Sequence, residues 1–350
     1  MNILLTSHRF FPEIGGTETV TELLAEAFSQ AGHKLIIVTQ TRDGNPRFRP
    51  AGLSDTPEQA RSEALPYQVV RRPNPQVLLR LYRWCDVVLQ IQIGLQTAWP
   101  LIFVNRPWVI SHHNWIDVQR SLQAWLKRRV IRFARHIAAS QALADRLPVP
   151  SILIPNPYRK EVFKPPIPEW RPKDLIFVGR LIRGKGVHVL IAALRELARN
   201  GVHRELTVVG DGPALPDLVR TVQELPIQFV GTKRGSELSE LLGQHRFLVV
   251  PSIDAEPFGI VAIEGLACGC TVVASRNSGL IEAVGAHGVF CEPGDPKSLA
   301  DAILEADAAS GLMDGVAQHL TRHDPQFVAS QYLKVLSDLS RRQNAAGVHP

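Results

Sequence analysis

The chain has 350 residues, of which 45% are hydrophobic and 21% are charged. This composition is that of a globular protein, the length allows two domains of ordinary size, and no apolar run approaches the length of a membrane-spanning helix. The net charge of +6 and the pI near 9.3 favour anionic partners, namely nucleotides, acidic glycans, phospholipid surfaces or nucleic acid, without choosing among them.

The first residues, MNILLTSH, lack the basic region and the small-residue cleavage site of a signal peptide, and they predict a first β-strand. The four cysteines form no C-x-x-C pair and stand in apolar surroundings. We therefore expect reduced core thiols of a cytoplasmic protein rather than a metal site. The cysteines are Cys85, Cys268, Cys270 and Cys291.

In the first half, short apolar runs alternate with segments of helical periodicity. The run Ile3–Ser7 precedes a segment with apolar residues at helical spacing from Val20 to Ala31, and KLIIVTQ follows Gly32, which predicts a β-α-β unit. Residues 42–66 are rich in Arg, Pro, Gly and Asp and predict an irregular surface excursion. The remaining predicted strands of the first sheet are YQVVRR, VVLQI, WVISH, HIAAS and SILIP.

The second half repeats this alternation after a proline-rich stretch at residues 155–172. Its predicted strands, LIFVG, LTVVG, IQFVG, FLVVP, TVVAS and GVFCE, are apolar on both faces, which is typical of a parallel sheet covered by helices on each side. The predicted helices begin near Gly186, Pro213, Gly235, Gly259, Gly279 and Pro296.

Two such halves predict two Rossmann-like domains facing a cleft. We assign residues 1–160 to the first domain and residues 161–325 to the second. A C-terminal helix is expected at 326–342, packing back toward the first domain, and residues 343–350 are expected to be a flexible tail.

Two carboxylates stand eight residues apart in EPFGIVAIE, directly after the predicted strand FLVVPS. Glu256 is placed before the N-terminus of the following helix, where its charge is favourable. Glu264 lies two turns further on between apolar neighbours and is expected to be partly buried, so it needs a partner. The hydroxyl groups of a sugar or a ribose suit both carboxylates.

Three glycine-containing turns follow predicted strands. In GRLIRGKG, residues 179–186, Arg180 and Lys185 with a helix N-terminus suit a diphosphate, although a solvated basic turn is equally consistent. GDGP, which begins at Gly210, is explained adequately by a tight turn with Pro at the first helical position. In FFPEIGGTE, Thr17 could cap the next helix and Gly16 could offer a bare N–H to a phosphate, although the two glycines are also explained by the turn itself.

Two further turns are weaker signals. SHHN places His112 and His113 at the end of a strand, where one of them must point into the crevice, and no further ligand at metal spacing accompanies them. SGLIE, residues 278–282, brings a helix N-terminus and one carboxylate to the same edge, although an ordinary capped helix start explains it as well.

Residues 106–160 hold ten Lys or Arg against Asp117 and Asp145, a local charge of +8. Within them, residues 118–136 predict a basic helix, whose apolar stripe is more readily explained as core-facing. The alternative is a face that binds an anionic membrane surface. The stripe is Leu122, Trp125, Leu126, Val130 and Phe133.

Taken together, these features resemble glycosyltransferase family 4, the retaining transferases of GT-B fold. The resemblance rests on the E-x7-E pattern from Glu256 to Glu264 and on the G-R-L…K-G pattern at residues 179–186. It covers nearly all of the C-terminal half, together with the first turn and the His region of the N-terminal half. Two positions depart from the pattern: Pro157 follows Pro155-Asn156 where glycine is usual, and Thr271 stands where proline is usual.

The resemblance implies that the first domain, residues 1–160, binds the acceptor and that the second, residues 161–325, binds a nucleotide-sugar. Glu264 would hold the ribose hydroxyls, and Arg180 and Lys185 would neutralise the diphosphate, so that no metal and no cofactor are implied. Glu256 and His113 would contact the donor sugar, with His112 as the second choice. The donor site would further include Gly16, Gly179, Gly210, Gly231, Phe258 and Gly259, with the base near residues 231–234.

The implied activity is transfer of a sugar, with retention, to a glycan or a lipid-linked acceptor in the synthesis of a surface polysaccharide or glycolipid. The protein would act in the cytoplasm, either free or bound at the inner face of the membrane, with no nucleic-acid partner. The alternatives are a nucleotide-sugar processing enzyme or phosphorylase on the same fold, and a non-catalytic nucleotide- or glycan-binding module. A dehydrogenase would need G-x-G-x-x-G with a downstream acid, which the sequence lacks.

Overall fold

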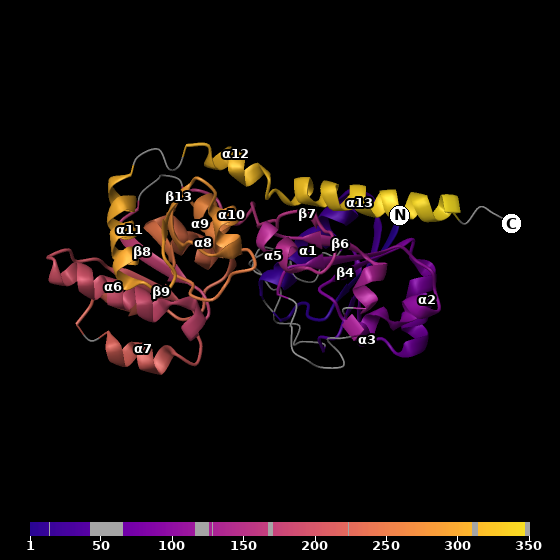
Figure 1. Cartoon of the computed structure of the whole chain (residues 1–350), viewed down its shortest axis with the longest axis horizontal. Coiled ribbons are helices and arrows are strands. Elements are labelled where there is room, and N and C mark those ends of the chain that lie inside the picture. Colours follow the sequence, from indigo (N-terminus) through magenta and orange to yellow (C-terminus); the bar gives the residue numbers. More distant parts are fainter. Residues whose placement is uncertain are drawn as a thin grey trace, which may run out of the picture. The chain divides into compact units, whose positions relative to one another are not determined.

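A computed structural model describes residues 1–13, 15–42, 66–115, 126–127, 129–166, 171–222, 224–309 and 314–346. The chain forms two compact α/β units (Figure 1). The first unit comprises Met1–Tyr158 together with Arg322–Pro350, and the second comprises Arg159–Thr321. The predicted excursion at 42–66 falls almost wholly outside the described residues.

Within the described residues, the first unit is built on a seven-stranded sheet in the order β3-β2-β1-β4-β5-β6-β7. All neighbouring strands run parallel. Every residue of β4 and β5 is buried, as expected for strands covered on both faces. The strands are β1 (Asn2–Ser7), β2 (Lys34–Thr39), β3 (Gln68–Arg71), β4 (Val87–Ile91), β5 (Trp108–His112), β6 (Arg135–Ala138) and β7 (Ile152–Leu153).

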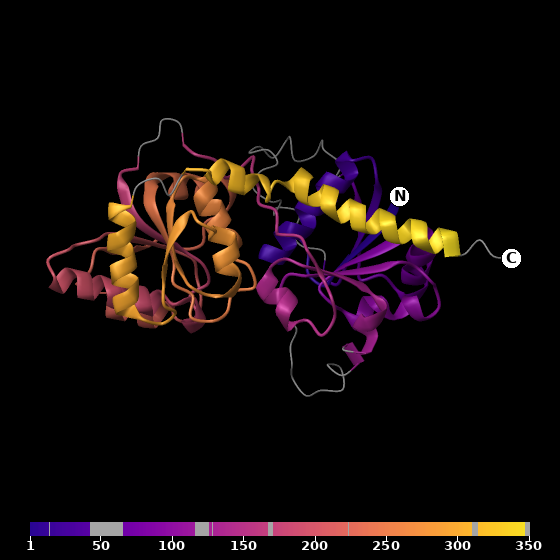
Figure 2. The same cartoon turned by 45° about the horizontal axis from the view of Figure 1, so that its top comes forward.

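The helical elements of the first unit include one from the far end of the chain. Helix α13 packs against α1, as Figure 2 shows. Asn74 caps α2 by accepting a hydrogen bond from the Val77 N–H at 2.9 Å, and Pro75 occupies the first turn. The elements are α1 (Gly16–Gln30), α2 (Pro75–Trp84), α3 (Leu95–Ala98), α5 (Gln141–Arg146), α13 (Pro325–Ala346) and the 3-10 turns η2 (Trp99–Ile102) and η3 (Ile131–Phe133).

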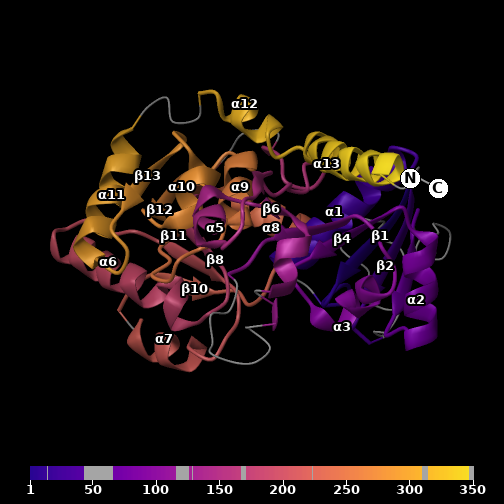
Figure 3. The same ribbon diagram turned by 45° about the vertical axis from the view of Figure 1, so that its right-hand side comes forward.

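The second unit has a parallel sheet whose six described strands follow the order β10-β9-β8-β11-β12-β13. One apolar core of this unit lies between the sheet and the helices α6 and α11, which lie side by side (Figure 3). Each aliphatic side chain fully buried there contributes about 1.5–3 kcal/mol. The strands are β8 (Lys173–Val178), β9 (Leu206–Val209), β10 (Ile227–Phe229), β11 (His245–Val250), β12 (Thr271–Ser275) and β13 (Gly288–Cys291).

The helices of the second unit follow its strands in turn. Asp295 caps α11 through the N–H groups of Lys297 and Ser298. The helical elements are η4 (Arg183–Lys185, a 3-10 turn), α6 (Val187–Arg199), α7 (Leu215–Thr221), α8 (Gly235–Gln244), α9 (Ile260–Ala267), α10 (Ser278–Val284), α11 (Pro296–Ala308) and α12 (Val316–Thr321).

The predicted parallel-sheet architecture is confirmed, and each run predicted as a strand forms one. Two local predictions are wrong. The basic helix cannot extend to residue 136, because 131–133 form the turn η3 and Arg135 begins β6, where it pairs with Val109. Pro213 is not the first residue of α7, which begins at Leu215. Residues 116–125 and 128 of the predicted basic helix lie outside the described residues.

All four cysteines are buried and unpaired, in agreement with the expected core thiols. Burial raises the pKa of Cys85 and of Cys270 to about 12, so both remain protonated thiols. Among the described helices, none has the length and apolarity required to cross a membrane.

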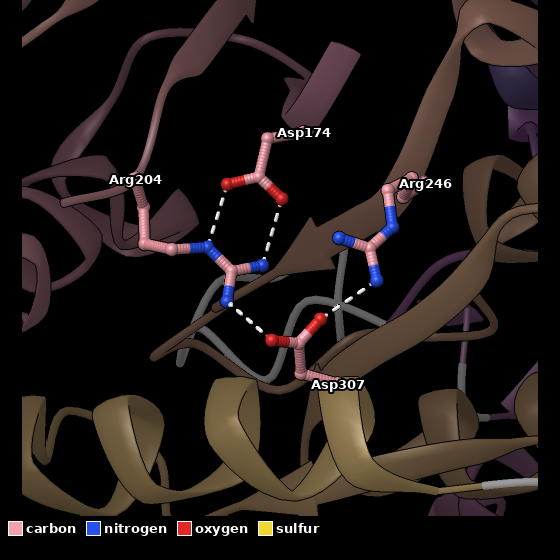
Figure 4. Close-up of polar contacts among 4 residues, drawn as sticks. All are labelled: Asp174, Arg204, Arg246 and Asp307. Atoms are coloured by element: carbon pink, nitrogen blue, oxygen red, sulfur yellow. Dashed lines mark hydrogen bonds and ion pairs between the residues drawn. The ribbon is translucent and has the colours of Figure 1, made fainter. Parts of the chain in front are cut away.

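A charge cluster, shown in Figure 4, joins the beginning of β8 to the end of α11. Arg204, with only 6% of its side chain exposed, donates to both carboxylate oxygens of Asp174, at 2.6 and 2.7 Å. It also reaches Asp307 at 3.3 Å, and Asp307 accepts from Arg246 at 2.7 Å. A buried guanidinium is stable only when its charge is compensated, so Asp174 is the residue on which this cluster depends.

We expect Asp174→Asn to lower the free energy of unfolding by about 1–3 kcal/mol, because Arg204 would lose its bidentate partner while remaining buried. Asp217→Asn is the matched control: its partner Arg220 is 76% exposed, and removal of such a pair costs less than about 0.5 kcal/mol. Urea denaturation of both variants measures the difference. Equal losses would show that Arg204 does not need Asp174.

Candidate active site

The strand order of the second sheet reverses between β8 and β11, which are neighbours in the sheet but not in the sequence. In parallel α/β sheets, ligands bind beyond the carboxyl ends of the strands at such a switch point. The GRLIRGKG turn follows β8, and the Glu256 loop follows β11. The topology therefore brings the two strongest sequence motifs to one edge of one sheet.

The Lys185 ammonium and the Glu256 carboxylate form an ion pair at this edge. Their side chains are 28% and 13% exposed. Ser252 donates a hydrogen bond from Oγ to the same carboxylate oxygen, at 2.6 Å. Lys185 is thus anchored at the end of η4, with part of its surface still accessible.

Backbone hydrogen bonds join the two loops that carry this pair. The Gly184 carbonyl accepts from the N–H groups of Ile253 at 2.8 Å and Asp254 at 3.1 Å. The Asn277 side chain donates to the carbonyls of Ile253 and Asp254, at 3.2 and 2.8 Å, and lies 3.3 Å from that of Ser252. Because the backbone of the loop after β11 is fixed at several points, the position of Glu256 is set by main-chain geometry.

Glycines allow the close approach of these loops. Gly186 has a φ of 75°, and a Cβ atom there would lie 1.8 Å from the Pro251 carbonyl oxygen. Gly210 has a φ of 140°, and its Cβ would lie 1.9 Å from the carbonyl oxygen of Gly179. Any side chain at either position would push apart the turns that form the switch point.

Glu264 lies on α9, as predicted, and is partly buried. Withdrawal of the carboxyl group from water raises its pKa to about 8, while the nearby positive charge of Arg159 lowers it. At neutral pH the isolated carboxyl group is therefore largely protonated. A ligand that donates two hydroxyl groups to it would favour the ionised form.

The other predicted donor-site residues lie at this end of the second sheet or near it. Arg180 is exposed directly after β8, and Gly179 packs against the Phe177 ring. Gly231 follows β10 and accepts from the Gly210 N–H at 2.8 Å. Phe258 is buried, and Gly259, with a φ of 107°, directly precedes α9.

In the first unit, the expectation that Thr17 caps α1 is wrong. The helix begins at Gly16, and Gly15 is its N-cap residue without a side-chain hydrogen bond. Thr17 Oγ1 instead accepts from Asn114 Nδ2 at 3.0 Å. Gly16 is exposed in the first helical turn, and its loop is tied in this way to the loop that carries His113.

His112 ends β5 and His113 follows it, and both are buried, with 0% and 5% exposure. The expectation that one of them points into the crevice stays a prediction. The His113 ring contacts Ser111 Oγ through Nε2 at 2.8 Å and Asn156 Oδ1 through Nδ1 at 2.7 Å. His112 Nε2 lies 3.0 Å from His136 Nδ1. Burial lowers the pKa of His113 to about 4 and that of His112 to about 3.

Sequence reasoning missed the residues that hold the site together. Ser252, Asn277 and Arg159 support the carboxylates of the second unit, and Ser111 and Asn156 hold His113. Asn156 carried a signal, because it stands in the Pro-Asn-Pro stretch that departs from the family pattern. The other four are common residue types in positions that only tertiary contacts define.

The raised pKa of Glu264 predicts a pH-dependent stability. An unfolded glutamate ionises near pH 4.5 and the folded one near 8, so the folded state loses stability as pH rises between these values. We expect Glu264→Gln to remove this loss. The melting temperature of the variant minus that of the wild type should therefore increase from about pH 5 to 8 and then level off.

The control is Glu237→Gln, which changes a side chain that is 66% exposed. Its melting temperature difference should not vary with pH. A Glu264→Gln difference that is equally flat would show that Glu264 titrates normally in the folded protein.

Two family models match the chain, one within each unit. The model of Glycosyltransferase Family 4 matches residues 14–157, and that of Glycosyl transferases group 1 matches residues 172–307. A glycogen synthase of Mycobacterium tuberculosis (strain CDC 1551 / Oshkosh) is 40% identical over 142 residues, which cover 39% of this chain and 34% of that protein.

The D-inositol 3-phosphate glycosyltransferase of Corynebacterium jeikeium (strain K411) is 33% identical over 187 residues, which are 49% of this chain and 44% of that protein. The chain thus spans less than half the length of these two relatives. The fold is similar to that in the crystal structure of Anabaena Alr3699/HepE in complex with UDP, with a TM-score of 0.73 and 19% sequence identity. The match covers 97% of this chain and 100% of that chain. The two family domains and the shared architecture show that this chain belongs to the glycosyltransferases of family 4 and has the GT-B fold.

Proposed function

We propose that the chain is a retaining, metal-independent glycosyltransferase that moves a sugar from a nucleoside diphosphate sugar to a glycan or lipid-linked acceptor. The observation that carries this proposal is the Lys185–Glu256 ion pair at the switch point of the second sheet. The pair places one cation for a diphosphate beside one carboxylate for sugar hydroxyl groups. The UDP bound by the structural neighbour makes UDP-sugars the first donors to test.

The charge changes of the reaction match these residues. Cleavage of the bond between sugar and diphosphate puts negative charge on the leaving diphosphate and positive charge on the sugar ring. Lys185 and Arg180 would stabilise the departing diphosphate, which is the electrostatic role that a divalent cation fills in other transferases. A donor phosphate oxygen would accept the proton of the acceptor hydroxyl on the same face, which retains the anomeric configuration.

The two carboxylates have separate roles in the proposal. Glu264 accepts hydrogen bonds from the ribose hydroxyl groups, which stabilise its ionised form. Glu256, with the N–H groups of Phe258 and Gly259, binds hydroxyl groups of the donor sugar. The turns at Gly179, Gly210 and Gly231 shape the donor site. His113 contacts the donor sugar and Gly16 the diphosphate.

We expect Glu264→Ala to weaken UDP binding about tenfold, because the ribose would lose a hydrogen-bonded partner. Lys185→Met should weaken UDP binding about 10- to 100-fold and leave uridine binding unchanged, because only the diphosphate contacts the lysine. Glu256→Gln should keep UDP affinity within about threefold but lower kcat about 100-fold or more. Calorimetry with UDP and uridine, and turnover of UDP-sugars with and without EDTA, measure these effects.

Equal loss of UDP binding in Glu256→Gln and Glu264→Ala would contradict this division of roles. UDP binding without turnover of any UDP-, GDP- or ADP-sugar would indicate a nucleotide-binding module instead. Loss of activity in EDTA that is restored by a divalent cation would contradict metal independence. Glu305→Gln, at an exposed position of α11, is the matched control and should change none of these quantities.

We further propose that the enzyme works at the cytoplasmic face of a membrane, bound through the first unit. Turns η2 and η3 pack onto one apolar cluster through residues such as Trp99 and Ile131, while Phe103 and Phe133 remain 73% and 84% exposed. Arg132 is exposed beside Phe133. Residues 87–144 hold seven Lys or Arg against one acid. Exposed aromatic side chains within a basic segment suit an anionic lipid surface.

We expect the protein to co-sediment with vesicles that contain about 30% phosphatidylglycerol, and to be released as salt screens the attraction. Arg132→Glu and Phe133→Ser should each weaken sedimentation, by charge and by lost apolar insertion respectively. Arg220→Glu makes the same charge change on an exposed residue of the second unit and is the control. Wild-type levels of sedimentation in Arg132→Glu would contradict the proposal, as would binding of the wild-type protein to neutral vesicles as strongly as to anionic ones.

A further inference from the structure

A buried hydrogen-bonded cluster joins His113 to two distant parts of the chain. The ring contacts Ser111 Oγ through Nε2 and Asn156 Oδ1 through Nδ1. Ser111 Oγ lies 2.6 Å from the hydroxyl group of Tyr332, which α13 contributes. All four side chains are at most 5% exposed. The C-terminal helix therefore reaches the candidate catalytic histidine through one hydroxyl group.

The returning chain also fixes Asn156. His323 Nδ1 lies 2.9 Å from the Asn156 carbonyl oxygen, and the His323 carbonyl accepts from the Tyr158 N–H at 3.2 Å. These contacts lie where the chain leaves the first unit, after Tyr158, and where it re-enters the unit, at Arg322. The partner of His113 Nδ1 is thus held by backbone contacts as well as by its own side chain.

The contacts determine where the protons lie. The side-chain amide oxygen of Asn156, Oδ1, only accepts, so His113 donates from Nδ1. A neutral ring protonated at Nδ1 has a lone pair at Nε2, to which the Ser111 hydroxyl donates, and Ser111 Oγ in turn accepts from Tyr332. If Nε2 were also protonated, Ser111 Oγ would accept from the ring, and either the Ser111 or the Tyr332 hydroxyl proton would then have no acceptor within the cluster. The cluster is therefore complementary to a neutral ring.

The titratable neighbours do not offset this preference. Within the described residues, they are His112 on β5, Tyr332 on α13 and, through Asn156, His323. Glu22 is buried on α1, which packs against α13, but it does not perturb the pKa of His113. Burial lowers that pKa to about 4, and the bond to Asn156 opposes the shift only in part.

We propose that Asn156, Ser111 and Tyr332 are positioning residues that hold His113 as a neutral imidazole with its proton on Nδ1. In the proposed function, on which this inference rests, His113 contacts a donor sugar whose ring becomes positively charged in the transition state. An imidazolium at that place would oppose the developing charge, whereas a neutral ring does not. The C-terminal helix then contributes to turnover, beyond its part in the fold.

The variant Asn156→Asp tests the proposal, because its effect on the pKa of His113 has a known direction. A carboxylate accepts from Nδ1 as the amide does, but its charge stabilises the imidazolium and raises the pKa of His113. We expect kcat of the variant to fall about tenfold or more near pH 6 and to recover as pH rises through the raised pKa. The wild-type kcat should vary little over this range, and KM for the donor should change less than about threefold.

Two further variants separate positioning from folding. Asn200→Asp makes the same change at the C-cap of α6 in the second unit and should leave the pH profile unchanged. Tyr332→Phe keeps the ring and removes the hydroxyl group. We expect a lower kcat, a melting temperature close to that of the wild type, and no additional fall of kcat at low pH. An Asn156→Asp profile that matches the wild type would overturn the positioning role.

A readout independent of activity keeps the two proposals distinguishable. In protein labelled with 15N-histidine, with His113→Gln for assignment, the His113 ring should be protonated at Nδ1 and should not titrate above about pH 5. Asn156→Asp should titrate at a higher pH. A wild-type ring protonated at Nε2 would overturn the tautomer assignment even if turnover follows the proposed function. A His113 ring that is protonated at Nδ1 as expected, in a protein that turns over no donor, would overturn the proposed function alone. The cluster would then have only a structural role.

Discussion

The contact between the loops after β8 and β11 is the constraint on which the candidate donor site depends. Two strands that are neighbours in the sheet, but far apart in the sequence, end at the same edge, and the Gly184 carbonyl joins their loops through the N–H groups of Ile253 and Asp254. Lys185 follows one side of this junction and Glu256 the other. Because main-chain bonds hold the junction, the ion pair is preorganised and needs no support from other charges.

The charged residues at the two ends of the strands in the second sheet differ in their burial and pairing. At the edge where β8 begins, Arg204 is almost fully enclosed and its charge is matched by Asp174 and Asp307. At the carboxyl edge, Arg180 is exposed and Lys185 keeps part of its surface accessible. A compensated cluster stabilises a fold, whereas accessible positive charge can bind an anion. The charges that stabilise the fold and the charges that can bind a ligand thus lie at opposite ends of the strands.

The sequence was sufficient for the strands and for the residues of the carboxyl edge, because alternating apolar runs and helical periods specify a parallel sheet, and a parallel sheet aligns the loops that follow its strands. It was insufficient where a contact spans the chain. Nothing in the local pattern indicates that Tyr332 reaches Ser111 or that Asn277 holds the loop after β11. The predicted basic helix is too long for a related reason. Arg135 pairs with Val109 in the sheet, which excludes a helix at this position, and the local sequence does not reveal that tertiary contact.

The crossover at residues 156–159 shows how one short segment serves both units. Asn156 fixes the ring of His113 in the first unit, and three residues later the charge of Arg159 acts on Glu264 in the second. Pro157 stands between them where the family usually has glycine. Proline restricts its own φ and the conformation of Asn156, so the Asn156 side chain is presented by a stiffer backbone than glycine would allow. A stiffer link suits a segment whose side chain must hold a buried ring at Nδ1, and this substitution is therefore consistent with an ordered crossover in this chain.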